Sequence, residues 1–184
     1  MPEEVILVDS HDKEIGSAEK TDAHVKGLLH RAFSVFVFNS KGEMLLQQRA
    51  RNKYHSGGLW SNTCCSHPKP GESVDDASKR RLQEEMGFTC KLKKVFHFIY
   101  KSALDKGMTE HELDHVFIGK FEGTVQPNSD EVHSYRWVTI ERLLQDLIES
   151  PDNYTIWFKL ALQETLQHTR QLDALQISLP GTQV

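Results

Sequence analysis

The segment 61–68, Ser-Asn-Thr-Cys-Cys-Ser-His-Pro, is the densest group of chemically active side chains in the sequence. If this segment is extended, Cys65 and His67 share one face while Cys64 and Ser66 share the other. One interpretation is that one cysteine packs in the core and the other is incidental. The alternative is that a thiol near an imidazole does chemistry, and the sequence leaves both open. A zinc finger is disfavoured, because the chain has no second Cys-x-x-Cys or matching histidine pair.

Two glutamates one residue apart, Glu110 and Glu112, form a second candidate group. In an extended chain they point the same way. Carboxylates held close together either bind a cation or raise one of their pKa values, and both outcomes are useful in catalysis. The alternative is the solvated edge of a charged loop.

Two histidines, His24 and His30, flank the start of a predicted hairpin. Each alone is more often a surface residue or a hydrogen-bonded core residue. Together with His67 and the two glutamates they make a mixed nitrogen and oxygen ligand set, which suits Zn, Mn or Mg. Spacing alone does not prove that these side chains converge.

A helix is predicted over residues 73–86. Ser73 followed by Asp76 is a capping-box pattern, and Gly87 is a typical C-terminal stop. Arginine–glutamate pairs four residues apart support the helix. Glu84 and Glu85 either form exposed ion pairs or hold Mg²⁺ against a diphosphate.

The remaining segments read mainly as strands. Apolar and β-branched runs predict strands over 5–8, 30–38, 44–48, 94–100, 115–121 and 134–138. The turn at residues 40–43 makes 30–38 and 44–48 a hairpin, and residues 51–58 read as a loop. Helices are predicted over 140–148 and 155–168. Strands interrupted by helices indicate an α+β fold. The chain after Arg170 gives no clear pattern, and Pro180-Gly181 ends any regular structure.

The length of 184 residues suits one domain that buries roughly 70% of its unfolded surface. We expect a single domain over residues 1–170 and a C-terminal tail over 171–184 that is either disordered or docked. A content of 38% apolar and 26% charged residues is typical of a globular protein rather than a disordered one.

Charge and hydropathy narrow the partners and the compartment. A net charge of −4 argues against a protein that mainly coats nucleic acid. No run approaches the roughly 20 apolar residues of a membrane span, and the acidic start predicts no signal peptide. Three cysteines without a secretory signal indicate reduced thiols and a cytoplasmic protein. We expect a small-molecule substrate, and a monomer or weak dimer.

Residues 66–88 resemble the Nudix box, a phosphate-associated motif built around a helix. The positions in register are Glu72, Arg80, Leu82, Glu84, Glu85, Gly87 and Phe88. Ser66 stands where the box has glycine, and Arg81 stands where it has the first glutamate of an Arg-Glu pair. The resemblance implies a mixed β-sheet core flanked by helices. The lost carboxylate weakens the metal cluster on which Nudix hydrolysis depends.

The flanking motifs are similar to those of type I isopentenyl-diphosphate isomerases. The match rests on residues 62–68, on Glu110 and Glu112, and on Trp157, and it runs from about Lys20 to Trp157. That family moves the double bond of isopentenyl diphosphate to give dimethylallyl diphosphate. The reaction protonates an unactivated alkene and passes through a tertiary carbocation, so it needs an acid, a base and no water.

The resemblance assigns expected roles to individual residues. Cys65 and Glu112 would be the acid–base pair, with Tyr100 as a proton relay and Trp157 facing the carbocation. One Mn²⁺, Zn²⁺ or Mg²⁺ would be held by His24, His30, His67, Glu110 and Glu112. A Mg²⁺ that accompanies the diphosphate would be held by Glu85. Diphosphate-binding residues would be Lys20, Arg49, Lys53 and Ser66.

Two other functions remain open at this level. The first is a Nudix pyrophosphohydrolase acting on a nucleoside diphosphate derivative, which would release phosphate or nucleotide. The second is a non-catalytic metal-binding or scaffold protein, in which Cys65 would be inert.

Overall fold

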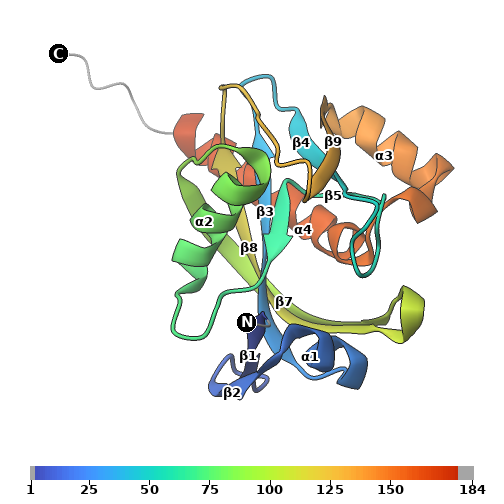
Figure 1. Ribbon diagram of the computed structural model, residues 1–184. Helices are drawn as coiled ribbons and strands as arrows, with labels where there is room; N and C mark the ends of the chain where they lie inside the picture. The colour runs from blue at the N-terminus through green and yellow to red at the C-terminus, as the bar shows by residue number, and fades with distance from the viewer. Residues whose placement is uncertain (1–2, 178–184) are drawn as a thin grey trace.

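The computed structural model describes residues 3–177, with side chains described as far as residue 170. Within this part, nine strands form one mixed sheet with helices on both faces (Figure 1). The strands are β1 (Glu4–Val8), β2 (Glu14–Glu19), β3 (His30–Phe38), β4 (Met44–Arg49), β5 (Trp60–Ser61), β6 (Cys64–Ser66), β7 (Leu92–Ala103), β8 (Thr109–Lys120) and β9 (Val132–Val138). The helices are α1 (Lys20–Lys26), α2 (Val74–Met86), α3 (Ile140–Glu149) and α4 (Ile156–Ile177), with short 3-10 turns at Asp105–Gly107 and Pro151–Asn153.

Strand β3 lies at the centre of the sheet. It runs parallel to β8, with His30 opposite Glu112, and antiparallel to β6, with Ser34 opposite Cys65. The β1–β2 hairpin joins its start, where Leu7 pairs with His30. A strand with neighbours on both edges and helices on both faces must be apolar on both sides, which explains the run of buried residues along β3.

The alternating side chains of the sheet make two separate cores. On one face Phe33, Val35 and Val37 pack with Leu82 and Met86 of α2. On the other face, the side chains that pack with α3 and α4 include Phe36, Phe38, Met44, Leu143 and Phe158. His30 of β3 and Glu112 of β8 lie on the face of the sheet that α4 covers. Side chains alternate between the two faces of a strand, and each of these residues is an even number of positions from a side chain of its strand in that core, Phe36 and Val116 respectively.

Helix α2 has the boundaries that its sequence predicts. The Ser73 hydroxyl accepts a hydrogen bond from the Asp76 backbone N–H at 3.1 Å. Gly87 ends the helix in the left-handed conformation, with φ +76°. Each arginine–glutamate pair forms, including Arg81 to Glu85 at 2.7 Å.

The α+β prediction is confirmed, and most predicted strands are present. β7 and β8 are longer than predicted, because the polar end of β7 pairs with the polar start of β8 and the two strands form an extended hairpin. β2, α1 and β5 have no counterpart in the sequence prediction. Helix α4 continues beyond Arg170 to Ile177, whereas Pro180-Gly181 lies outside the described residues. No helix in the described part is long and apolar enough to cross a membrane.

Candidate active site

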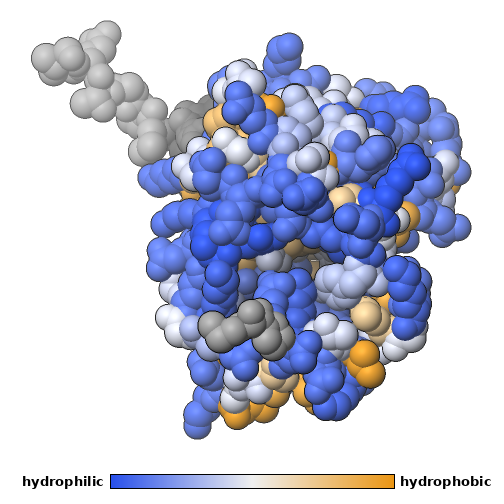
Figure 2. Space-filling model, viewed as in Figure 1, coloured by the Kyte–Doolittle hydropathy of each residue, from blue (hydrophilic) through white to orange (hydrophobic). Residues whose placement is uncertain are grey.

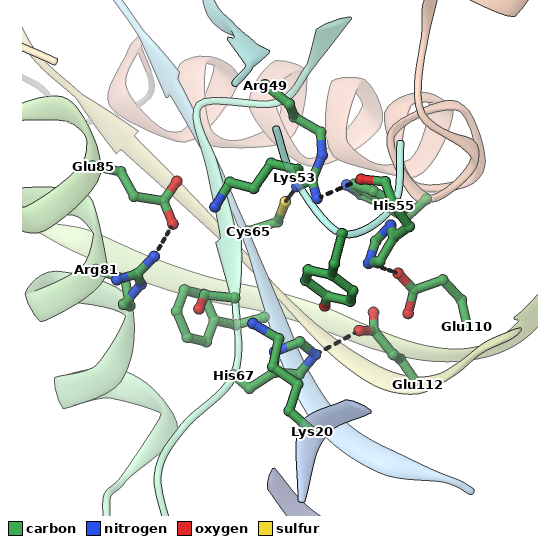
Figure 3. Close-up of a pocket in the computed structure, with 14 residues that line it drawn as sticks. Lys20, Arg49, Lys53, His55, Cys65, His67, Arg81, Glu85, Glu110 and Glu112 are labelled. Atoms are coloured by element: carbon green, nitrogen blue, oxygen red, sulfur yellow. Dashed lines mark hydrogen bonds and ion pairs between the residues drawn. The ribbon is translucent and has the colours of Figure 1, made fainter. Parts of the chain in front are cut away.

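A cavity of about 450 Å³, open mouth included, lies where α1, β3, β6 and β8 meet. Figure 2 shows that the surrounding face is mainly hydrophilic and hollowed near its centre. The lining side chains come from segments far apart in sequence (Figure 3). They are Lys20, Phe33, Arg49, Lys53, Tyr54, His55, Cys65, Ser66, His67, Arg81, Glu85, Glu110, Glu112 and Trp157. Ten predicted site residues therefore line one cavity. The other three, His24, His30 and Tyr100, contact the lining residues Glu110 and Glu112.

Three histidines and two glutamates converge at one end of the cavity. His67 Nε2 lies 2.8 Å from Glu112 Oε1, and His30 Nε2 lies 3.5 Å from the same oxygen. His24 Nε2 lies 3.3 Å from Glu110 Oε2. All five side chains are buried. Since β3 and β8 are parallel neighbours, the register that places His30 opposite Glu112 builds this cluster directly.

The hydrogen bonds around these histidines leave ring nitrogens available to a cation. His24 Nδ1–H donates to the Lys20 carbonyl at 2.7 Å, and His30 Nδ1–H donates to the Leu28 carbonyl at 2.8 Å. Each Nε2 is then a bare lone pair aimed at the carboxylates. Among the described residues, His24 Nε2 and Glu110 Oε2 are buried without a hydrogen-bond partner. These orphaned atoms suit a divalent cation, and two groups of side chains could hold one: His24, His30, His67 and Glu112 in the first, and His24, His55 and Glu110 in the second.

Burial sets the protonation states of the cluster. It lowers the pKa of His67 to about 3 and also lowers the pKa of His24, so these two imidazoles are neutral, as metal ligands must be. Burial and the neighbouring Glu112 raise the pKa of Glu110 well above its usual range. Although burial opposes it, the hydrogen bond from His67 and the nearby His30 ring hold the pKa of Glu112 well below its usual range.

Tyr100 approaches the cluster from β7. Its hydroxyl donates to Glu112 Oε2 at 2.6 Å, because the β7–β8 register places these residues opposite each other. The Tyr100 side chain is buried, which raises the pKa of its hydroxyl and keeps the proton on the oxygen. Glu112 is therefore held by His67 on one oxygen and by Tyr100 on the other.

Cys65 lines the same cavity from β6. The two cysteines point to opposite faces, with Cys64 fully buried in the core under α2. Burial raises the pKa of the Cys65 thiol to about 12, although nearby Arg49 opposes the shift. Arg49 Nη1 lies 4.0 Å from the sulfur, and its guanidinium covers the Trp157 ring at 5.2 Å. Trp157 Nε1–H donates to Ser61 Oγ at 2.9 Å, which fixes the ring.

Basic side chains gather at the mouth of the cavity, and both lysines there are paired with an acid. Lys20 contacts Glu3 at 3.1 Å, and Lys53 pairs with Glu131. Glu85 of α2 is buried, and it accepts hydrogen bonds from Arg81 at 2.7 Å and from Gln47 at 2.9 Å. This mouth offers both cations and a carboxylate to a phosphorylated ligand.

Four lining residues were not among the predicted site residues, namely Phe33, Tyr54, His55 and Arg81. His55 and Tyr54 lie in the loop between β4 and β5, and their rings pack edge to face at 4.2 Å. Tyr54 also packs edge to face on His24 at 5.5 Å and lies under Lys20. The loop is polar and rich in glycine, so its composition predicted only a turn. The available signal was a Tyr-His pair directly after the basic residues at 49–53.

Comparisons with known proteins identify the class of the protein. Residues 28–158 match the NUDIX domain family. Two solved structures share the fold at low sequence identity. The DR0079 protein of Deinococcus radiodurans has a TM-score of 0.66 at 19% identity over 80% of this chain and 90% of that one. A MutT NUDIX hydrolase of Burkholderia pseudomallei has a TM-score of 0.58 at 20% identity over 73% and 96%.

Closer sequence relatives narrow the class. An isopentenyl-diphosphate Delta-isomerase of Burkholderia multivorans is 52% identical over 89% of this chain and 93% of its own length. An isopentenyl-diphosphate Delta-isomerase 2 of Photorhabdus laumondii is 55% identical over 86% and 90%. The chain belongs to the isopentenyl-diphosphate Delta-isomerase family of NUDIX-domain proteins.

Proposed function

We propose that the protein interconverts isopentenyl diphosphate and dimethylallyl diphosphate. The observation that carries this conclusion is the convergence of one thiol and one buried glutamate in a single cavity with basic residues at its mouth. The reaction adds a proton to the terminal carbon of the alkene and removes a proton from the carbon nearer the diphosphate. No redox equivalent and no other reactant is needed.

Cys65 and Glu112 would share the two proton transfers. They project from β6 and β8, which both pair with β3, so the hydrocarbon tail can lie between them. One group donates the proton and the other accepts it, and the reverse reaction exchanges the roles. The Tyr100 hydroxyl, at 2.6 Å from Glu112, passes protons to and from that carboxyl group.

Trp157 would stabilise the carbocation formed between the two transfers. Its ring is buried and fixed by Ser61, so a π face lines the cavity without a conformational change. A cation over an aromatic face gains about 1–2 kcal/mol when water is excluded. The same packing keeps water away from an intermediate that water would quench.

We propose that the histidine and glutamate cluster binds one Mn²⁺, Zn²⁺ or Mg²⁺ through His24, His30, His67, Glu110 and Glu112. A divalent ion there would neutralise the two carboxylates and fix the geometry of the catalytic glutamate. The chain itself prepares the site, because backbone carbonyls orient His24 and His30 before any ion arrives.

The diphosphate would bind at the mouth, through Lys20, Arg49 and Lys53 with a hydrogen bond from Ser66. Arg49 suits bidentate contact with phosphate oxygens, whereas lysines act as point charges. Lys20 and Lys53 would exchange their glutamate partners for phosphate. Glu85 would hold a Mg²⁺ that bridges to the diphosphate.

Arg81 argues against nucleotide hydrolysis as the main activity. Its guanidinium contacts Glu84 and Glu85 at 2.7 Å and Glu131 at 3.2 Å. In the Nudix box this position is a glutamate. A fixed positive charge among the carboxylates competes with the cluster of metal ions that a Nudix hydrolase assembles there.

The deciding experiment is incubation with isopentenyl diphosphate and Mg²⁺ or Mn²⁺ in deuterated water. Proton and phosphorus NMR should show deuterium entering dimethylallyl diphosphate with the diphosphate intact. Release of phosphate from nucleoside diphosphate derivatives, without isomerisation, would instead support the hydrolase.

A further inference from the structure

His55, a residue that the proposed mechanism does not use, contacts the proposed metal-binding cluster from the loop between β4 and β5. Its Nε2 lies 3.3 Å from Glu110 Oε1, and its side chain is 3% exposed. The imidazole stacks on His24 at 5.5 Å and packs edge to face on Trp157 at 6.0 Å. Figure 3 shows the ring aimed at the Glu110 carboxylate, with the dashed line between them.

The two oxygens of Glu110 face different neighbours. Oε2 lies 3.3 Å from His24 Nε2, and these two buried atoms have no hydrogen-bond partner among the described residues. Oε1 faces His55 instead. One oxygen is thus left for a cation shared with His24, while the other is available to a donor outside the ligand set.

The surroundings of His55 select the tautomer that donates to Glu110. Nδ1 lies 3.2 Å from Ser56 Oγ, which can donate to it. Ser56 is held in the left-handed conformation, φ +50°, and its backbone N–H donates to Asp105 Oδ1 at 3.0 Å. The Arg49 side chain donates to the His55 carbonyl at 3.3 Å. The loop is therefore tied to the β7–β8 hairpin, the element that also carries Glu110.

We infer that His55 is a positioning residue of the metal site, which donates its Nε2–H to Glu110 Oε1 and so directs Oε2 toward the ion and His24. This inference rests on the proposed metal-dependent isomerase. The contact orients a ligand in the way that outer-shell partners of metal ligands do in general, and loss of such a partner typically weakens metal binding 10–100-fold.

The test is a titration of the metal-free protein with Mn²⁺ alone, followed by electron paramagnetic resonance of the free ion. His55→Phe keeps a ring against Tyr54 and Trp157 but removes the donor, and it should weaken Mn²⁺ binding about 10–100-fold with an unchanged stoichiometry. His55→Gln restores an N–H donor and should bind within about 3-fold of the wild type. Exposed His133 provides matched controls, because His133→Phe and His133→Gln should not alter the affinity.

Ser56→Ala gives a second route that leaves the His55 ring in place. Without the hydroxyl, His55 Nδ1 loses its hydrogen-bond donor, and the tautomer with a proton on Nε2 is no longer favoured. Mn²⁺ affinity should therefore fall by a few-fold, on the order of one lost hydrogen bond. If His55→Phe does not fold, this variant and His55→Gln decide the matter. If His55→Phe folds and binds Mn²⁺ with unchanged affinity, the inference is overturned. If His55→Phe is unfolded, unchanged Mn²⁺ affinity in Ser56→Ala overturns it.

Co²⁺ absorption separates a positioning residue from a direct ligand. A positioning residue predicts the same band positions and intensities in His55→Gln as in the wild type. A changed coordination spectrum would make His55 a ligand and overturn the inference. If the wild type does not bind Mn²⁺, the proposed metal site itself is wrong. If the wild type and His55→Phe bind Mn²⁺ equally, the metal site stands and only the role of His55 is wrong.

Discussion

Cys64 and Cys65 are adjacent in the chain and have different environments. The side-chain alternation of β6 directs Cys64 into the core, where it is fully buried among apolar residues. Cys65 faces the cavity opposite Ser34. The chemical difference between two identical thiols is therefore set by one step along an extended strand.

Substitution of the proposed acid–base pair should abolish turnover without unfolding the protein. Cys65→Ala and Glu112→Gln should each lower isomerase turnover by at least about 10²-fold, because each removes one of two required proton transfers. Cys90→Ser is the matched control, since that thiol lies away from the cavity. Steady-state rates with isopentenyl diphosphate give the comparison. Near-normal turnover in either variant contradicts the assigned roles.

His115 should make the stability of the fold depend on pH. It points away from the site and contacts Asp12 at 3.0 Å, with Arg31, Lys94 and His97 also near. Burial lowers the pKa of His115 to about 4. Because the unfolded histidine titrates near 6.5, the unfolded state binds more protons between these values, and stability falls as the pH drops through this window.

The size of this effect can be measured with a variant. From pH 7 to pH 5 His115 should remove about 2 kcal/mol of stability, the free energy linked to its shifted titration. His115→Asn should show a loss smaller by that amount in urea unfolding at the two pH values. His97→Asn is the control, because that neighbouring side chain is exposed. Parallel pH dependence in wild type and His115→Asn would contradict the burial argument.

At the scale of elements, the end of α2 sets the position of Glu85. Gly87 has φ +76°, and a Cβ there would lie 2.2 Å from the carbonyl oxygen of Gln126. The next turn of chain also bonds back to this helix end, since the Gln126 backbone N–H donates to the Met86 carbonyl at 3.1 Å. Close approach of two backbones requires glycine at this position.

A pair of glycine substitutions separates strain from collision. Gly71 has a similar φ of +80°, but a Cβ added there would meet only open space. Gly71→Ala should cost about 1 kcal/mol, the left-handed penalty alone. Gly87→Ala should cost at least about 3 kcal/mol, because backbone must also move. Urea unfolding measures the loss of stability in each variant. Equal losses would show that the backbone at Gln126 moves away from the new Cβ without an energetic cost.

The sequence predicts best the elements whose own residues determine them. Residues 30–38 form β3 because apolar and β-branched side chains suit a strand buried on both faces. α2 carries its own cap and stop signals. β2, in contrast, is largely exposed and polar, and only its pairing with β1 makes it a strand. β5 and β6 are too short to show any periodicity.

The candidate site was predictable from motifs but not from periodicity. The resemblance to a family supplied thirteen residues, of which ten line one cavity, and their roles are proposals. Their convergence depends on the parallel pairing of β3 with β8, which joins His30 to Glu112 from distant parts of the sequence. No local pattern encodes that contact. His55 was missed for the same reason, since its contact with Glu110 exists only after the hairpin folds over the loop.

For the whole molecule, the buried cluster of histidines and glutamates lowers the free energy of unfolding as well as forming the proposed metal site. Five polar side chains from α1, β3, β8 and the segment after β6 are brought together and buried. The buried Glu112 carboxylate lacks a compensating positive charge, and burial beside it disfavours the charged form of Glu110. A cation that binds only the folded chain should offset this cost.

Removal of metal should therefore lower both activity and thermal stability. We expect chelation with EDTA to abolish turnover and Mn²⁺ or Mg²⁺ to restore it. Mn²⁺ at about 100 times its Kd should add about 2.7 kcal/mol of stability, which corresponds to a rise in Tm of roughly 5–10 °C for a chain of this length. Calorimetric scans of metal-free and Mn²⁺-loaded protein measure the shift.

Glu110→Gln together with His24→Gln should remove most of the rise in Tm, because these residues supply two of the proposed ligands. Full activity of the metal-free protein, or an equal Tm with and without Mn²⁺, would mean that the buried cluster is stabilised by its own hydrogen bonds and holds no ion.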